Sequence, residues 1–194
     1  MASVKTICVY CGSSARVDEA YRTAATRLGT IFAKAGIGLV YGGGRVGLMG
    51  LMADAALAAG GRVTGIIPHH LHDREVGHGG LTEMILVDDM HIRKRRMFEL
   101  SDAFVTLPGG LGTLDETMEI LTWKQLGLHD KPIIVVNVGN YWAPLLELVD
   151  HAVTNGFAGR EVRHFFRVVS TVEEVLPALA QMPEAAVPAA PNLA

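Results

Sequence analysis

The sequence has little of several features that would point to a specialised class of protein. It has only two cysteines, but at 194 residues it is long enough to form a core without disulfide staples. A net charge of −3 gives no bulk reason to expect a nucleic-acid or membrane partner. The apolar runs are strand-sized, and the start MASVKTICVY lacks the features of a signal peptide. We therefore expect a soluble, cytoplasmic protein.

The two cysteines, Cys8 and Cys11, form a CxxC pair. In redox proteins this motif sits at the start of a helix, where the helix dipole lowers the pKa of the thiol. Here the surrounding TICVY is apolar and β-branched, which predicts a strand, and residues three apart on a strand point to opposite faces. The pattern therefore favours a structural role over a redox one.

Short apolar runs alternate with amphipathic helical patterns along the chain. The predicted strands are Thr6–Tyr10, Gly38–Tyr41, Arg62–Ile67, Met84–Val87, Ala103–Leu107, Ile133–Asn137 and Phe166–Val169. The predicted helices are Asp18–Ala35, Gly47–Ala59, Met90–Leu100, Thr113–Leu126, Trp142–Asn155 and Thr171–Gln181.

Several of these strands, such as IGLVY and PIIVV, are apolar on both faces, as in a parallel sheet covered by helices on both sides. The alternation predicts an α/β fold: a Rossmann-like, doubly wound parallel sheet of about seven strands. We expect one domain over residues 1–182 and a disordered Pro/Ala-rich tail over 183–194.

Three loops rich in glycine or small residues each follow a strand and lead into a helix. They are CGSSAR (residues 11–16), GGGRVGLMG (residues 42–50) and PGGLGT (residues 108–113). Ligands of such sheets bind beyond the carboxyl ends of the strands, and N–H groups at a helix start attract phosphate. None of the loops matches GxGxxG or carries a Walker lysine, and no acid lies where a dinucleotide ribose would need it. A mononucleotide therefore fits better than a dinucleotide.

Acidic residues follow the third loop directly. Thr113 and Glu116 have the T-x-x-E form of a capping box, and Asp115 is placed to complement the helix dipole. A cap alone would not need the paired glycines that precede it. Capping and catalysis therefore both remain open for Glu116.

The segment DDMHIRKRRMFEL (residues 88–100) supplies a basic candidate. At helical spacing Met90, Arg93, Met97 and Leu100 share one face, and the side chains of Lys94, Arg95 and Arg96 are expected to point mostly to solvent. A guanidinium on an apolar stripe needs an anionic or polar partner. Arg93 is therefore the best basic candidate for the site.

Histidines gather in the loop HHLHDREVGHGG (residues 69–80), which we interpret as a flap over the site. A metal site formed by His69, His70, His72, His78 and His91 is the alternative. Their spacing matches neither HExxH nor a structural zinc pattern, which favours the flap and predicts no metal.

These motifs together resemble the Lonely Guy family of cytokinin riboside 5′-monophosphate phosphoribohydrolases. The family pattern PGGxGTxxE is present from Pro108 to Glu116, and MHxRK is present from Met90 to Lys94. CGSS, YGGGxxGLMG and LTW followed by QLGLHDKP also fit, so the resemblance covers about residues 5 to 180. One departure is Asp115, where many members have a second glutamate. Many members also carry an outdated lysine-decarboxylase label.

The resemblance implies hydrolysis of the N-glycosidic bond of adenine-type nucleoside 5′-monophosphates, by a homodimer that needs no metal or organic cofactor. It implies that Glu116 and Arg93 form the catalytic pair. It assigns phosphate binding to Gly109, Gly110, Gly112 and Thr113, and a nucleotide-lining role to Lys94, Glu83 and Thr122. The wider expected binding set adds Ser13, Gly43, Gly44, Met90, Leu111, Leu114 and Asp115. For Glu119 we favour a surface or dimer contact over assistance in catalysis.

Two other functions compete with this interpretation. A pyridoxal-phosphate decarboxylase would need a lysine in a suitable site, and none of the five lysines, Lys5, Lys34, Lys94, Lys124 and Lys131, is convincing. A non-catalytic nucleotide-binding carrier would keep the phosphate turn without the chemistry. The presence of both Glu116 and Arg93 argues against the carrier.

Overall fold

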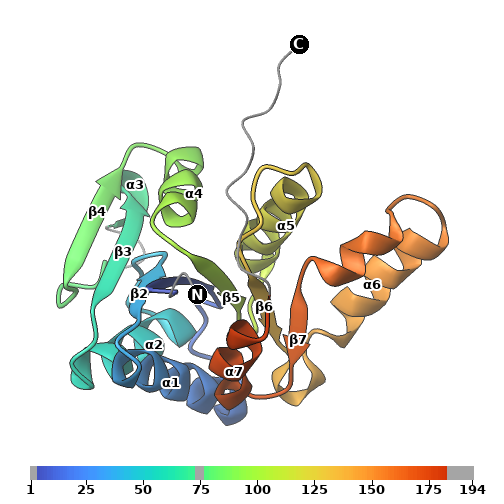
Figure 1. The fold of residues 1–194 in the computed structure, drawn as a ribbon. Helices are drawn as coiled ribbons and strands as arrows, with labels where there is room; N and C mark the ends of the chain where they lie inside the picture. The colour runs from blue at the N-terminus through green and yellow to red at the C-terminus, as the bar shows by residue number, and fades with distance from the viewer. Residues whose placement is uncertain (1–3, 73–76, 183–194) are drawn as a thin grey trace.

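The computed structural model describes residues 4–72 and 77–182, and within them the chain forms one seven-stranded sheet (Figure 1). The strand order is β4-β3-β2-β1-β5-β6-β7, and all six neighbouring pairs are parallel. The strands are β1 Thr6–Tyr10, β2 Gly38–Tyr41, β3 Val63–Pro68, β4 Glu83–Val87, β5 Ala103–Thr106, β6 Ile133–Val136 and β7 Arg167–Val169. The strand order reverses between β1 and β5, so the topological switch point lies there.

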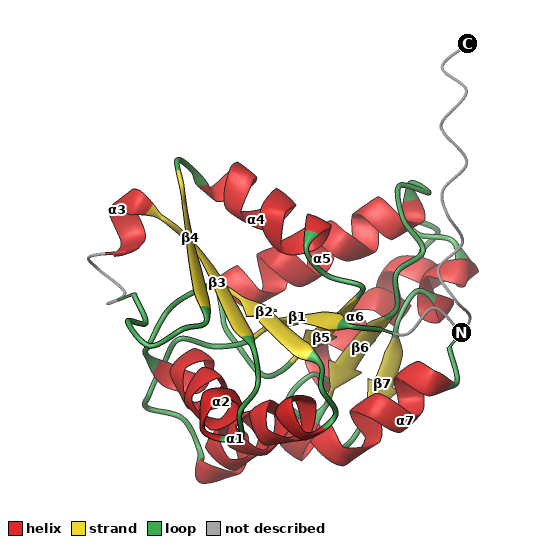
Figure 2. Cartoon of the chain, turned by 60° about the vertical axis from the view of Figure 1, so that its left-hand side comes forward, coloured by secondary structure: helices red, strands yellow, loops and turns green. Residues whose placement is uncertain are grey.

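Helices cover both faces of this sheet, with α1, α2 and α7 on one side and α4 and α5 on the other (Figure 2). Their bounds are α1 Glu19–Lys34, α2 Gly47–Ala58, α3 His69–His72, α4 Met90–Glu99, α5 Leu111–Gln125, α6 Ala143–Thr154 and α7 Val175–Ala180. Three 3₁₀ turns complete the list: η1 Val138–Asn140, η2 Arg160–His164 and η3 Val172–Glu174. The predicted doubly wound α/β fold is confirmed.

The core consists of two layers, one on each face of the sheet. Alternate residues of β1 enter different layers: Ile7 and Val9 pack with α1 and α2, whereas Cys8 and Tyr10 pack with α4 and α5. Cys11 joins the first layer, so Cys8 and Cys11 lie on opposite faces and both are free thiols. Burial raises the pKa of both thiols well above its ordinary value. The structural interpretation of the CxxC pair therefore holds.

Some predicted elements differ from the observed ones. Helix α5 begins at Leu111, two residues before the predicted start, and the predicted last helix is a 3₁₀ turn followed by the six-residue α7. The histidine-rich loop begins with the short helix α3, and its residues 73–76 lie outside the described residues. The predicted tail lies outside them too, and the single domain over residues 1–182 stays a prediction. Each helix of the described ranges is too short or too polar to cross a membrane.

The contact between α1 and α2 depends on Gly29. A Cβ atom at this position would lie 2.2 Å from the carbonyl oxygen of Met52 on α2. Helix propensity alone predicts that Gly29→Ala stabilises α1 by about 1 kcal/mol. We expect the clash to dominate, so that the free energy of unfolding falls by about 1–3 kcal/mol in a denaturant titration. Thr26→Ala, at an exposed position of the same helix, is the control, and a Gly29→Ala variant as stable as this control would contradict the packing.

Candidate functional site

Three loops meet at the carboxyl edge of the sheet, as their positions after β1, β2 and β5 predicted. The backbone N–H of Gly12 donates to the carbonyl of Pro108 at 3.0 Å, and the N–H of Leu48 donates to the carbonyl of Gly12 at 3.0 Å. The first bond joins the loop after β1 to the loop after β5, and the second joins it to the start of α2. Backbone hydrogen bonds therefore hold the three loops together at the switch point.

The amino end of α5 is open to a ligand. Its N-cap residue is Gly110, no side chain caps it, and its first turn contains no acidic residue. The first intrahelical bond runs from the N–H of Leu114 to the carbonyl of Gly110, so the preceding N–H groups have no acceptor within the helix. Leu111 and Gly112 are exposed there. This end of the helix is suited to an anion.

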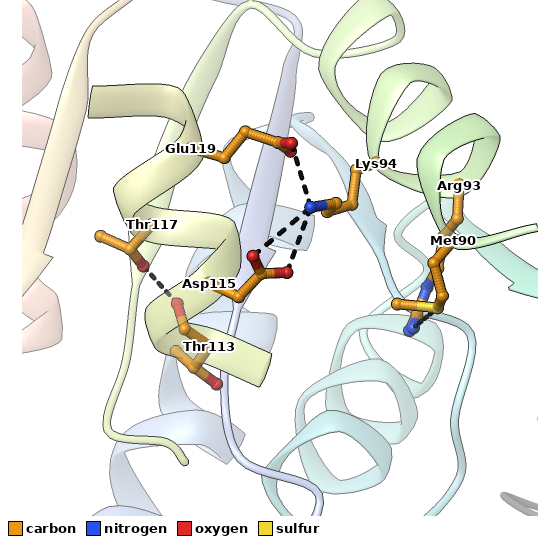
Figure 3. A network of polar contacts seen from close by, with 7 residues as sticks. All are labelled: Met90, Arg93, Lys94, Thr113, Asp115, Thr117 and Glu119. Carbon is orange, nitrogen blue, oxygen red and sulfur yellow. Dashed lines mark hydrogen bonds and ion pairs between the residues drawn. The ribbon is translucent and has the colours of Figure 1, made fainter. Parts of the chain in front are cut away.

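The capping-box interpretation of Thr113 and Glu116 is wrong. A capping box needs the threonine at the N-cap, whereas Thr113 is the third residue of α5. The carbonyl of Thr113 accepts a hydrogen bond from the hydroxyl of Thr117 at 2.6 Å (Figure 3). The same hydroxyl lies 3.0 Å from the hydroxyl of Thr106 at the end of β5. These buried threonines attach the start of α5 to the sheet, and Glu116 lies in the second turn.

The Arg93 side chain is buried, and it reaches the carboxyl ends of two strands. Its Nη2 donates to the carbonyl of Gly42 at 2.8 Å, and its Nε donates to the carbonyl of Ile66 at 3.1 Å. Its Nη1 contacts the sulfur of Met90 at 3.6 Å (Figure 3). A Cβ at position 42 would lie 2.1 Å from Nη2, so any other residue there would displace the guanidinium. Arg93 has the polar partners that its apolar surroundings required, and they are backbone carbonyls.

Lys94 does not point to solvent, contrary to the sequence-based expectation. Its ammonium lies 3.1 Å from an oxygen of Asp115 and 3.0 Å from an oxygen of Glu119, and its side chain is only 12% exposed (Figure 3). The reason is that α4 and α5 cover the same face of the sheet, so that Lys94 extends across to α5. Burial alone would lower the pKa of Lys94, but the hydrogen bonds and charges of Glu119 and Asp115 raise it. Arg95 and Arg96 are exposed, as predicted.

Glu116 is half-buried, and its negative charge affects the pKa values of residues in β1 and directly after it. Burial is the main cause of the raised pKa values of Cys8, Tyr10 and Cys11, and the charge of Glu116 raises each of them further. The charge of Arg93 acts on the same Cys8 thiol in the opposite direction. The charges of both predicted catalytic residues therefore act on the same thiol of the central strand β1.

The other predicted site residues lie at different distances along their elements from the meeting point of the three loops. Ser13 is exposed in the first loop, and Leu114 is half-buried in the first turn of α5. Thr122 is exposed on α5, one turn beyond Glu119. Glu83 is not brought to the site: it is the first residue of the edge strand β4, in register with Thr64, at the opposite end of the sheet.

Gly43 and Gly44 are buried beneath the end of the histidine-rich loop. Gly44 pairs with Gly77 in an isolated bridge, and the N–H of His78 donates to the carbonyl of Gly43 at 3.1 Å. The buried His78 ring also contacts Asp54 at 2.8 Å. Among residues 4–72 and 77–182, no group of three or more His, Cys, Asp or Glu side chains is placed to hold a metal ion.

Sequence reasoning missed a fourth loop at this edge. The residues Asn137 to Trp142 follow β6, and the hydroxyl of Tyr141 donates to the carbonyl of Gly109 at 2.6 Å. The loop lacks a run of glycines, so it has no local motif of the kind that marked the other three loops. Its place after a parallel strand was the signal that could have found it.

Fold and site together define a Rossmann-like α/β protein with an uncapped helix start at its switch point. A family model described as "Possible lysine decarboxylase" matches residues 49–179. A cytokinin riboside 5′-monophosphate phosphoribohydrolase of Arabidopsis thaliana is 46% identical over 172 residues, which is 89% of this chain and 81% of the relative. One of Rhodococcoides fascians is 44% identical over 90% of this chain and 89% of the relative. The chain therefore belongs to the Lonely Guy family of phosphoribohydrolases.

Solved structures agree on the fold. The molybdenum cofactor carrier protein of Chlamydomonas reinhardtii superposes with a TM-score of 0.67 over 92% of this chain and 98% of its own, at 22% identity. The molybdenum cofactor binding protein of Rippkaea orientalis gives a TM-score of 0.68 at 21% identity, over 93% and 98% of the two chains. At these identities the likeness extends to the fold alone.

Two glycines of the third loop should respond oppositely to substitution. A Cβ at Gly109 would lie 2.1 Å from the hydroxyl of Thr113 and 2.9 Å from the N–H nitrogen of Gly12, whereas a Cβ at Gly112 would meet nothing within 4 Å. We expect Gly109→Ala to reduce the free energy of unfolding by about 1–3 kcal/mol. Gly112→Ala should be neutral, or stabilising by up to about 1 kcal/mol. Thermal unfolding of both variants tests this, and equal losses would contradict the observed contact between the loops.

Proposed function

We propose that this protein hydrolyses the N-glycosidic bond of adenine-type nucleoside 5′-monophosphates, N6-prenylated AMP, AMP or both. The products are the free base and ribose 5-phosphate. The observation that carries the proposal is the position of Glu116, one turn inside the open amino end of α5, in a chain 46% identical to a cytokinin riboside 5′-monophosphate phosphoribohydrolase. No metal or organic cofactor has a part in the reaction as proposed.

In this proposal the phosphate of the substrate binds at the start of α5. The N–H groups of Gly110, Leu111, Gly112 and Thr113 precede the first intrahelical bond. The glycines leave room for close approach, and the first turn carries no carboxylate that would repel the anion. The acids that follow belong to the second turn, which is why one segment carries both phosphate-binding glycines and carboxylates.

Glu116 then acts on the sugar. Cleavage of a glycosidic bond builds positive charge on the ribose, and a carboxylate stabilises such an oxocarbenium-like transition state while it orients water or a hydroxyl. Lys94 holds Asp115 and Glu119, the neighbouring acids on α5. Glu116 lies three residues before Glu119 and is its neighbour on the surface of α5. In this proposal the carboxylate of Glu116 faces the ribose.

Arg93 assists the departure of the base. Two of its nitrogens donate to the carbonyls of Gly42 and Ile66, which fixes the guanidinium at the carboxyl ends of β2 and β3. Further N–H groups of the same guanidinium can hydrogen-bond to the purine as negative charge develops on it. The guanidinium of Arg93 is a poor proton donor. Its contribution is therefore electrostatic.

The geometry of the lysines argues against a pyridoxal-phosphate decarboxylase. Burial lowers the pKa of Lys124 and Lys131, as a Schiff-base lysine requires. However, Lys124 donates to the carbonyls of Asp130 and Lys131, which precede β6, and Lys131 donates to the carbonyl of Phe98. Both therefore lie at the amino end of the sheet, opposite the three loops. Lys94 is engaged by two carboxylates.

We expect purified protein to release free base from AMP or N6-isopentenyl-AMP in a chromatographic assay, with equal rates in the presence of EDTA. Glu116→Gln should lower kcat about a hundredfold or more, because it removes the charge that stabilises the transition state. Glu19→Gln, an exposed acid on α1, is the matched control and should retain the full rate. Tight binding of AMP without base release would instead support the non-catalytic carrier, and loss of activity in EDTA would contradict a metal-free reaction.

The expected homodimer is also proposed, with α6 in its interface. This helix carries Leu145, Leu146, Leu148, Val149 and Val153, yet none of its residues is buried in the described chain. Leu148 is 61% exposed, and Phe157 beyond the helix is 88% exposed. An apolar helix face of this kind is characteristic of a protein–protein contact. A cytoplasmic location stays a prediction.

Sedimentation should give about twice the chain mass of 20.8 kDa at micromolar concentration. Leu148→Lys should shift the protein toward the monomer, because it places a charge in the apolar contact. Thr26→Lys, on the exposed face of α1, should leave the dimer intact. Sedimentation of the wild-type protein as a monomer would exclude the dimer and would leave the proposed reaction unaffected.

A further inference from the structure

The loop after β6 is held in one defined conformation. The side-chain oxygen of Asn137 accepts from the N–H of Trp142 at 2.7 Å, and its amide nitrogen donates to the side-chain oxygen of Asn140 at 3.1 Å. Asn140 has a φ of 62°, the only positive φ of a non-glycine residue in the described chain. This left-handed conformation is uncommon for residues with a side chain, and asparagine is one of the few that adopt it readily. The two hydrogen bonds of Asn137 therefore fix the backbone on both sides of the residue that follows Asn140.

That residue is Tyr141, and its ring is packed on two sides. It meets Tyr21 of α1 edge to face, with ring centroids 5.5 Å apart, and it meets Trp142 in the same way at 4.9 Å. Its hydroxyl donates a hydrogen bond of 2.6 Å to the carbonyl of Gly109. The tyrosine thus links the loop after β6 to the turn that leads into α5.

The accepting carbonyl belongs to the peptide between Gly109 and Gly110. A trans peptide is planar, so its N–H points in the direction opposite to its C=O. The Gly110 N–H is one of the donors at the open end of α5. A bond that fixes the Gly109 carbonyl therefore also fixes the direction of the Gly110 N–H. This constraint matters because glycines on both sides of a peptide allow it to rotate easily.

We propose that Tyr141 is a positioning residue for phosphate binding: its hydroxyl holds the Gly109–Gly110 peptide so that the Gly110 N–H faces the bound phosphate. The inference rests on the proposed function, because it concerns the same site. Tyr141 acts through the turn and not on the reacting atoms. Its loss should therefore weaken the binding of ligands that carry a phosphate and spare ligands that lack one.

Tyr141→Phe tests the proposal, because it removes the hydroxyl and keeps the ring between Tyr21 and Trp142. We expect calorimetry to show about 3- to 10-fold weaker binding of ribose 5-phosphate, the loss typical of one hydrogen bond. KM for the nucleotide should rise by a similar factor with kcat nearly unchanged. Binding of adenosine, which has no phosphate, should not change. A tyrosine that only stabilised the fold would not separate the two ligands in this way.

Tyr21→Phe is the matched control, since it removes the hydroxyl of the neighbouring ring and should change neither ligand's affinity. Equal affinity of wild type and Tyr141→Phe for ribose 5-phosphate would overturn the inference while leaving the proposed hydrolysis intact. Equal weakening of ribose 5-phosphate and adenosine would overturn it as well. If the wild-type protein neither binds ribose 5-phosphate nor releases base, the proposed function fails, and this inference fails with it.

Discussion

The site depends on two backbone hydrogen bonds, from Gly12 to Pro108 and from Leu48 to Gly12, which close three loops onto one another at the switch point of the sheet. The loops come from strands that are neighbours in space but far apart in sequence. Their contact is close because glycines form it: a Cβ at Gly47 would lie 2.3 Å from the backbone of Ser13, and one at Gly109 would lie 2.9 Å from the backbone nitrogen of Gly12. That closure places the turn before α5 against the loops that follow β1 and β2.

Two basic residues that are adjacent in sequence have separate tasks in this arrangement. Arg93 turns inward and joins α4 to the ends of β2 and β3 through backbone carbonyls. Lys94 turns toward α5 and engages Asp115 and Glu119. Helix α4 thereby contacts both the ends of β2 and β3 and helix α5, which together carry the proposed substrate site. This ion-paired cluster joins α4 to α5 in the part of the helix that also carries Glu116.

Much of this could be predicted. The alternation of apolar runs and amphipathic patterns identified all seven strands, and the three small-residue loops were correctly expected to meet, because the carboxyl ends of parallel strands share an edge. The errors have local causes. A threonine three residues before a glutamate resembled a capping box, but Gly110 begins the helix and the pattern falls one turn too late. The side chain of Lys94 was expected to be solvated because helical periodicity indicates only which residues share a face. It does not indicate that carboxylates of the neighbouring helix α5 lie within reach.

The sequence by itself therefore determined the order of elements, the fold class, the three loops that meet at one edge and the membership of the phosphoribohydrolase family. These features depend on local periodicity and on contiguous motifs, both of which involve residues that are close in sequence. Only the tertiary structure decided the partners of the functional side chains. Arg93 and Gly42 are 51 residues apart, Tyr141 and Gly109 are 32 apart, and Lys94 and Asp115 are 21 apart. Contacts over such separations exist only once the sheet has brought its strand ends together, because no local pattern specifies which distant group a side chain will meet.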